Sequence, residues 1–158
     1  MSTLEHSMIG VGGRSYAGER WAQAVLKVIV ADVDPRTFAG WARLIGASTA
    51  TLGTWCRAAR VSPRRSTELA RLSRALHLTG GMLTDLQEVL DIIDPRTVKR
   101  LLTRAGVDGI DGPLPLQEFL REQRLVQNPT ALHALTLALA ARGIQSTDGG
   151  PASVDLIA

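Results

Sequence analysis

Basic side chains gather in two runs whose chemistry suits the binding of phosphate groups. Between residues 57 and 74, six arginines stand against one acidic residue, Glu68: Arg57, Arg60, Arg64, Arg65, Arg71 and Arg74. A second run follows an acidic stretch (Asp85, Glu88, Asp91, Asp94) and contains Arg96, Lys99, Arg100 and Arg104. Guanidinium and ammonium groups donate charge-assisted hydrogen bonds to phosphate oxygens. The runs either bind a polyanion or are the solvated faces of amphipathic helices.

The remaining reactive residues predict neither catalysis nor a metal site. The chain has no glycine-rich phosphate loop after a strand, no nucleophile elbow and no HExxH pair. His6, His77 and His133 lack the spacing of metal ligands, and Cys56 is the only cysteine. We therefore expect a protein that is not an enzyme and needs no cofactor. Cys56 is expected to be partly buried and inert, and oxidant sensing by its thiolate is the alternative.

Composition favours helices packed on helices. Hydrophobic residues make up 45% of the 158 residues and aromatic ones only 4%, and the apolar residues are mostly Leu, Ala, Val and Ile. The net charge of +3 barely favours a polyanionic partner, so the distribution of charge must decide. A single cysteine excludes an intramolecular disulfide and fits a reducing compartment. The best apolar stretch is interrupted by Lys27 and is too short to cross a membrane, so we expect a cytoplasmic protein.

Hydrophobic periodicity and punctuating residues predict a string of helices. We expect them at about 19–32, 35–45, 49–60, 63–78, 83–91, 94–105, 115–126 and 129–142. Three of them begin with a capping side chain followed by proline: Ser62-Pro63, Asp94-Pro95 and Asn128-Pro129. The sequence therefore predicts an all-α fold.

Residues 41–55, WARLIGASTATLGTW, have the layout of a helix-turn-helix. The small Ala42 is expected where the two helices cross, and Gly46 in a left-handed turn that glycine adopts without a steric penalty. The expected inward positions, at helical spacing, are Trp41, Ile45, Leu52 and Trp55. All three tryptophans, Trp21 included, are expected in the core.

A second, more divergent unit follows between residues 82 and 107. Asp91 occupies its turn, because aspartate tolerates a left-handed backbone. Its inward residues are expected to be Leu83, Leu86, Leu90, Val98 and Leu102. The tetrapeptide DPRT occurs at 34–37 and again at 94–97, but a sixty-residue duplication explains the pattern less well than this unit does. The first DPRT is expected to open a scaffold helix and the second a reading helix.

Together these features resemble the DNA-binding domain of AraC-type transcriptional regulators. The resemblance is carried by WARLIGASTATLGTWCRAARVSPRRSTELARLSRAL and LQEVLDIIDPRTVKRLLTRAG and, with the leading helix, covers about residues 20–107. Gln87 stands where the family prefers alanine, and Asp91 where it prefers glycine. The resemblance implies two helix-turn-helix units, held apart by a linker helix, whose reading helices enter successive segments of the major groove of DNA.

The resemblance also assigns the outward residues of each reading helix. Those of the first are Ser48, Thr49, Ala50, Gly53, Thr54 and Arg57, and those of the second are Asp94, Arg96, Lys99, Arg100 and Thr103. The residues expected to bind DNA are Ser48, Thr49, Thr54, Arg57, Arg60, Arg64, Arg65, Arg96, Lys99, Arg100 and Arg104. Because base edges are read by Arg, Lys, Asn and Gln, the second helix is expected to carry most of the sequence preference.

The expected organisation follows from these units. It comprises a flexible segment (1–18), a first helix-turn-helix (19–61), a linker helix (62–79), a second helix-turn-helix (82–107), a C-terminal helical extension (113–143) and a flexible tail (144–158). The expected partner is double-stranded DNA, bound by a monomer or a homodimer without membrane contact.

A helical protein-interaction module on a degenerate helix-turn-helix scaffold is the alternative. Its support is the weak reading surface of the first helix and a surplus of C-terminal apolar residues: Leu114, Leu116, Phe119, Leu120, Leu125, Leu132, Leu135, Leu137 and Leu139. The surplus could cover the domain, form a dimer interface or bind a partner such as RNA polymerase.

Overall fold

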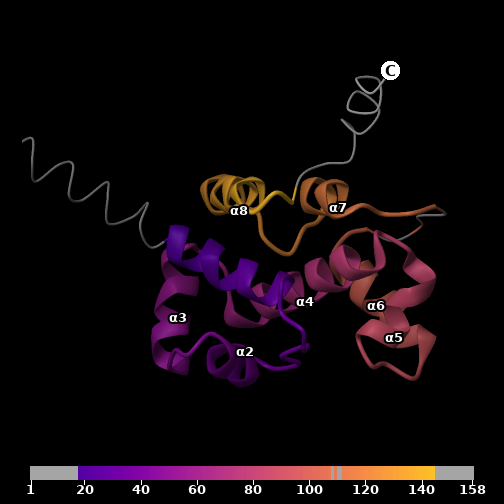
Figure 1. Ribbon diagram of the computed structural model, residues 1–158, viewed down its shortest axis with the longest axis horizontal. Coiled ribbons are helices and arrows are strands. Elements are labelled where there is room, and N and C mark those ends of the chain that lie inside the picture. The colour runs from indigo at the N-terminus through magenta and orange to yellow at the C-terminus, as the bar shows by residue number, and fades with distance from the viewer. Residues whose placement is uncertain (1–17, 108, 110–111, 145–158) are drawn as a thin grey trace, which may run out of the picture.

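Every regular element that the structure describes is a helix, which confirms the predicted all-α fold class (Figure 1). The computed structural model describes residues 18–107, 109 and 112–144. The flexible segments expected at 1–18 and 144–158 lie outside these residues, except that Gly18 is helical and Ile144 donates its backbone N–H to the Leu139 carbonyl. Across the described ranges, no helix has both the length and the apolar character that crossing a membrane demands.

Most helices lie close to their predicted positions, but the stretch predicted as one helix at 83–91 is divided into a 3-10 turn and a short α-helix. Residues 18–29 form the first helix, called helix 18–29 below. It is followed by α2 (Phe38–Leu44), α3 (Thr49–Ala58), α4 (Pro63–Thr79), the 3-10 turn η1 (Leu83–Asp85), α5 (Leu86–Val89), α6 (Pro95–Arg104), α7 (Leu116–Glu122) and α8 (Pro129–Ala141). Ser62, Asp94 and Asn128 cap α4, α6 and α8 through their side chains, and proline follows each of them, as predicted.

The two copies of DPRT differ in structure. In the second copy, Asp94 caps α6 by accepting a hydrogen bond from the Arg96 backbone N–H at 3.0 Å. In the first copy, the backbone of Arg36 is left-handed and Thr37 is the capping residue, so α2 begins at Phe38 rather than at 35 as predicted. The tetrapeptide does not fix its own conformation, because the chain around it decides which residue becomes the cap.

Helix α7 is shorter than predicted, ending at Glu122 instead of near 126. Gln123 is buried and takes an extended backbone, and its side-chain amide bonds to both backbone groups of Val126. The amide nitrogen donates to the Val126 carbonyl at 2.8 Å, and the amide oxygen accepts from the Val126 N–H at 2.9 Å. A side chain thus replaces the helical hydrogen bonds that would have continued α7.

Helix α4 occupies the centre of the molecule. It contacts α2, α3, α5 and α7, and Figure 1 places α7 and α8 above it, α2 below it, α3 at one end and α5 and α6 at the other. From Ser66 to Leu76, only Glu68 and Arg71 interrupt a run of buried residues. A helix buried on most of its sides must share a core with all its neighbours. The helix expected to be a linker is therefore the central core helix of the fold.

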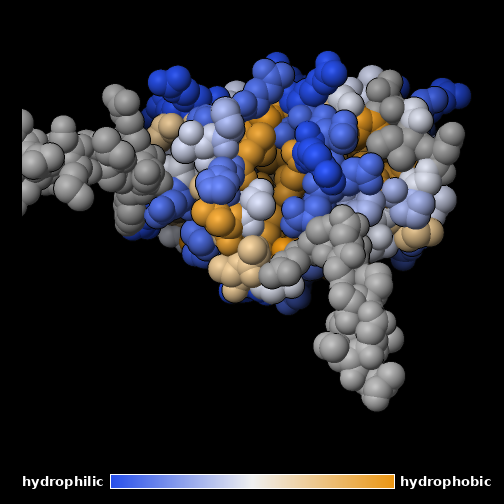
Figure 2. Space-filling view, turned by 90° about the horizontal axis from the view of Figure 1, so that it is seen from above, coloured by the Kyte–Doolittle hydropathy of each residue, from blue (hydrophilic) through white to orange (hydrophobic). Residues whose placement is uncertain are grey.

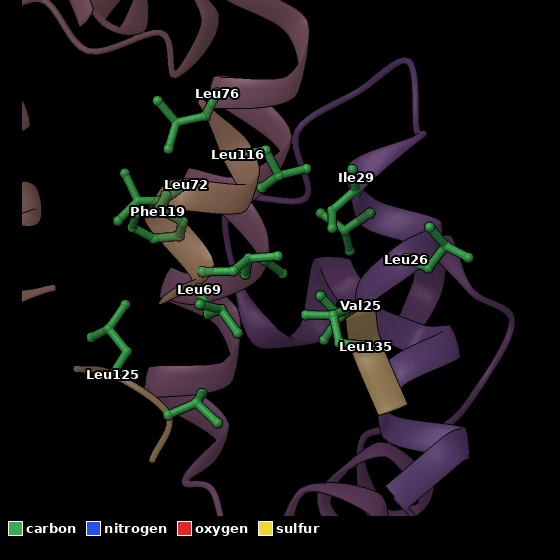
Figure 3. Packing of buried hydrophobic residues seen from close by; sticks show 14 of the residues in the cluster. Val25, Leu26, Ile29, Leu69, Leu72, Leu76, Leu116, Phe119, Leu125 and Leu135 are labelled. Carbon is green, nitrogen blue, oxygen red and sulfur yellow. The ribbon is translucent and has the colours of Figure 1, made fainter. Parts of the chain in front are cut away.

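The buried apolar residues form one continuous cluster. Figure 3 shows a layer of it built from α4, α7, α8 and helix 18–29: Leu69, Leu72, Leu76, Leu116, Phe119, Leu135, Val25 and Ile29. Burial of each such side chain contributes roughly 1.5–3 kcal/mol. The C-terminal extension thus covers the domain, and of its surplus apolar residues only Leu132 and Leu137 are not buried.

The two predicted turns have the same geometry. Gly46 and Asp91 both have a left-handed backbone, with φ of 72° and 54°. In each turn, a backbone N–H reaches back five residues to a carbonyl at 2.9 Å, from Ala47 to Ala42 and from Ile92 to Gln87. This bond defines the Schellman motif that ends many helices. The predictions for Gly46 and Asp91 are confirmed, and Asp91 also forms an exposed ion pair with Arg36.

Buried polar groups tie α4 to its neighbours. Trp21 and Trp41 are fully buried, as predicted, while Trp55 is only partly buried. The indole N–H of Trp41 donates to the Ala24 carbonyl at 2.9 Å, and that of Trp21 donates to Ser66 Oγ at 3.0 Å. Ser73 lies two turns further along α4 and is equally buried, but its hydroxyl has no hydrogen-bond partner in the described part of the chain.

Ser66 and Ser73 form a matched pair for testing the buried hydrogen bond. We expect Ser66→Ala to lower the free energy of unfolding by about 1–3 kcal/mol, because the Trp21 N–H is left buried and unpaired. Ser73→Ala is expected to be neutral or stabilising, because it removes a hydroxyl that lost its water hydrogen bonds on folding. Urea unfolding followed by tryptophan fluorescence measures both. Equal effects of the two variants would contradict the role given to the Trp21 bond.

Candidate nucleic-acid interface

Helix α3 presents a surface of hydroxyl groups that are already bonded within the helix. Ser48 caps it by accepting from the Thr51 backbone N–H at 3.0 Å, and Thr54 donates to the Ala50 carbonyl at 3.0 Å. Arg57 in turn donates to Thr54 Oγ1 at 3.2 Å, so its side chain lies along the helix. Ser48, Thr49, Thr54 and Arg57 are exposed, as their predicted role requires.

Gly53 is not part of that surface. It was expected to point outward, but it is buried. A Cβ atom built on Gly53 would meet Arg57 Nη1 at 3.6 Å, which places the guanidinium group over the glycine. The sequence could not give this arrangement, because it depends on the rotamer that Arg57 adopts to reach Thr54.

Helix α6 separates its apolar and basic residues onto two sides. Val98 and Leu101 are buried, whereas Arg96, Lys99, Arg100 and Thr103 are exposed. Val98 is inward as predicted, but Leu101 is more buried than Leu102. No described residue forms an ion pair with Arg96, Lys99 or Arg100. Their charges are therefore available to a ligand in the solvent.

The first basic run divides between the surface and the interior. Arg57, Arg60, Arg64 and Arg65 are exposed. Arg71 instead pairs with Asp34, with Nη2 and Oδ2 2.7 Å apart, and Arg74 is buried and donates from Nε to the Ala31 carbonyl at 2.9 Å.

The interpretation of Arg71 and Arg74 as part of a phosphate-binding stripe is therefore wrong. Both side chains bind the segment that follows helix 18–29 and hold it against α4. Asp34 lies 37 positions from Arg71 along the chain, and Ala31 lies 43 positions from Arg74. The exposed part of the run ends at Arg65.

Arg60 has an unusual backbone. Its φ is 59°, and it ends α3 with the same turn that Gly46 and Asp91 form, closed by a 3.0 Å hydrogen bond from the Val61 N–H to the Cys56 carbonyl. Glycine is the usual residue at this position, because a Cβ atom clashes with the neighbouring carbonyl in a left-handed backbone. A strained position that keeps a long, charged side chain is a candidate for function.

The segment between α7 and α8 draws the C-terminal ends of α3 and α6 together. The Arg124 backbone N–H donates to the Ala105 carbonyl after α6, and Asn128 Nδ2 donates to the Ala59 carbonyl after α3, both at 2.7 Å. A chain extends by at most about 3.6 Å per residue. The two carbonyls consequently lie no more than about 25 Å apart.

Several basic residues meet beside this segment. Arg104 at the end of α6 reaches Glu68 on α4, with Nη2 2.9 Å from Oε1, and Arg64 Nε lies 3.7 Å from the same oxygen. A hollow of about 300 Å³ is lined by Arg64, Arg65, Glu68, Arg104, Arg124 and Leu125. The sequence analysis missed Arg124, because a single arginine outside every motif gives no signal of its own.

A partly apolar groove of about 450 Å³ lies between helix 18–29 and α8. Its apolar lining includes Ala22, Ala134, Leu137 and Ala138, and its polar lining consists of Glu19, Arg20, Gln23, Thr130 and His133. Leu137 is 57% exposed. Seen from the side of α7 and α8, hydrophobic surface is visible between hydrophilic side chains (Figure 2).

The remaining candidate residues offer less chemistry. Cys56 is fully buried, whereas partial burial was predicted. Burial raises the pKa of its thiol, and the hydrogen bond with Ser66 and the charge of Arg57 lower it less. His77 and His133 belong to no group of metal-ligating side chains among the described residues.

No known protein family, curated protein or solved structure that was compared with this chain matches it. The resemblance to AraC-type regulators is therefore a prediction from the sequence alone.

The burial of Cys56 predicts a thiol that is unreactive and that lowers stability at high pH. The pKa of the Cys56 thiol is higher in the folded chain than in the unfolded chain. The contribution of the thiol to the free energy of unfolding is therefore complete below the unfolded pKa of about 8.5 and is lost as the pH rises from there through the folded pKa. Urea unfolding at several pH values should show this loss in the native chain and not in Cys56→Ala. Thiol reagents should label the folded protein far more slowly than the unfolded one. Equal labelling rates would contradict the burial.

Proposed function

We propose that this chain binds duplex DNA and reads its sequence through α6, as a transcriptional regulator does. The observation that carries the proposal is the exposed, unpaired set of Arg96, Lys99 and Arg100 on a helix that follows a left-handed turn at Asp91. Arginine and lysine recognise the O6 and N7 atoms of guanine in the major groove. A good bidentate contact of this kind contributes about 1–3 kcal/mol of discrimination.

Helix α3 has the smaller share in reading bases under this proposal. The methyl groups of Thr49 and Thr54 suit contacts with thymine methyl groups, whereas the hydroxyl groups of Ser48 and Thr54 already donate hydrogen bonds within the helix. Arg57, Arg60, Arg64 and Arg65 suit the phosphate backbone, because their side chains are exposed and charged. Phosphate contacts position the protein without reading the sequence.

The segment between α7 and α8 limits how the two helices can meet DNA. Successive major-groove segments on one face are about 34 Å apart. The C-terminal ends of α3 and α6 lie no more than about 25 Å apart, so the helices enter successive segments only if their N-terminal halves diverge. We infer that α6 is the primary reading helix and that α3 lies closer to the backbone.

The AraC-type resemblance adds the regulatory role to this proposal. In that view the chain acts in the cytoplasm as a monomer or a homodimer, without a cofactor and without catalysis. Much of the C-terminal extension is buried in the core, so most of its apolar surface is not available to a partner. RNA polymerase remains a candidate partner for the exposed part of α8.

A protein-interaction module is the second candidate. It is favoured by the partly apolar groove between helix 18–29 and α8 and by the exposed Leu137. Such a surface suits an apolar helix of another protein. This function predicts binding that is insensitive to salt and independent of α6.

Binding to duplex DNA at increasing salt tests the proposal. The affinity should fall steeply, since each neutralised phosphate releases counterions. Arg96→Ala should relax the preference among sequences selected from random DNA, whereas Arg64→Ala should weaken binding to all sequences alike. Arg142→Ala, at the end of α8, is the control and should change neither. If the chain does not bind DNA at low salt, or if both basic runs can be substituted without effect, the proposal is wrong.

Arg60→Gly separates stability from DNA binding. Glycine relieves the left-handed strain, so the free energy of unfolding should rise by about 1 kcal/mol. The same change removes a phosphate contact, so DNA binding should weaken. The slope of log affinity against log salt should decrease by about one. Thermal unfolding and fluorescence anisotropy measure the two effects. A variant that is more stable and binds DNA unchanged would show that Arg60 has no part in the interface.

A further inference from the structure

The hollow at the junction of α4, α6 and the segment after α7 is rich in positive charge. Four arginines surround it: Arg64, Arg65, Arg104 and Arg124. Arg64 and Arg65 lie in the first turn of α4, and Arg104 is the last residue of α6. Arg124 follows Gln123, at the end of α7. Like charges gathered in a small space repel one another, so an anion placed among them is stabilised.

Glu68 is the only acidic residue in the lining, and its position hides its charge. Its side chain is 14% exposed, whereas those of Arg64 and Arg104 are 78% and 48% exposed. Both arginines approach the same carboxylate oxygen. The carboxylate therefore lies beneath the guanidinium groups, and the surface that a ligand would meet is positive.

Arg124 is held in place by the turn that ends α6. Its backbone N–H is bonded to the Ala105 carbonyl at 2.7 Å. A Cβ atom on Gly106, whose φ is 79°, would lie only 2.8 Å from Arg124 Cγ. The absence of a side chain at Gly106 thus lets the aliphatic part of Arg124 lie on the turn, and Arg124 is one of the residues that line the hollow.

We propose that these four arginines bind one phosphate of the DNA backbone, which makes Arg124 a DNA-binding residue outside both helix-turn-helix units. The proposal rests on the proposed function and deepens it. Guanidinium groups match the oxygens of a phosphate in pairs of parallel hydrogen bonds. The N-terminal end of the long helix α4 adds a positive partial charge on the same side.

The pocket lies where the ends of α3 and α6 converge, so it sits between the two units that meet the DNA. A phosphate bound there fixes the position of α6 relative to α4, because Arg104 and Arg64 belong to these two helices. Glu68 orients both arginines through one oxygen, and its negative charge opposes a negative ligand. Glu68→Gln keeps an acceptor oxygen for the arginines and removes the charge, so this variant is expected to strengthen binding.

The test compares Arg124→Ala with Arg121→Ala, which removes an exposed arginine of α7 that does not line the hollow. In fluorescence anisotropy with duplex DNA, Arg124→Ala should weaken binding about fivefold at low salt and lower the slope of log affinity against log salt by about one. The loss should be equal for all sequences. Arg121→Ala should bind like the unaltered chain, and Glu68→Gln should bind several times more tightly at low salt.

The failures of the two proposals are distinguishable. If the unaltered chain does not bind DNA, the proposed function fails and the pocket with it. If it binds DNA but Arg124→Ala behaves like Arg121→Ala, only the pocket is wrong. If Glu68→Gln binds no more tightly while thermal unfolding shows that it is folded, the cluster is structural and the pocket is likewise overturned.

A titration with inorganic phosphate alone separates the DNA backbone from free phosphate as the source of the ligand. Chloride at the same ionic strength is the control. We expect phosphate and chloride to affect the protein equally, as general screening does. Saturable binding of phosphate that is lost in Arg124→Ala would assign the pocket to a small phosphate compound and overturn the backbone contact.

Discussion

The fold depends on the burial of one helix on most of its sides. Helix α4 has neighbours from both halves of the chain, so its middle cannot carry the polar face of an ordinary surface helix. It uses small residues and leucines there, and each polar group that remains needs a partner. Ser66 accepts the indole N–H of Trp21, and Arg74 bonds to a backbone carbonyl. Ser73 is the exception, with a hydroxyl that no described residue satisfies.

Around this helix, the chain repeats one way of ending helices. The turns at Gly46, Arg60 and Asp91 share a left-handed residue and a hydrogen bond that reaches back five positions. The same turn occurs with glycine at Gly80, Gly106 and Gly143, and among the first three only Gly46 is a glycine. The other two keep a charged side chain at a strained position, and both of these side chains lie at the surface. Asp91 pairs with Arg36, which lies 55 positions away along the chain, whereas Arg60 forms no ion pair within the described ranges and is part of the proposed interface.

The arginines serve two physical purposes. Arg71 and Arg74 are used inside the fold, where each is paired with oxygen atoms of the segment after helix 18–29. Those on α6 and at the start of α4 face solvent, and at one junction they are held over a covered carboxylate. An arginine that is paired inside the fold is not available to a ligand in the solvent. The net charge of the chain therefore says little about its affinity for DNA. The basic surface is smaller than the sequence suggested but more concentrated.

The sequence alone determined the helices and the left-handed turns at Gly46 and Asp91, because capping and turn bonds join residues only two to five positions apart. It also determined most of the buried faces, since helical periodicity is local. Tertiary structure decided which arginines are exposed, how Arg57 covers Gly53 and where Arg124 lies. These depend on partners such as Asp34, 37 positions away from the arginine that it binds, and no local pattern encodes which distant segments will meet.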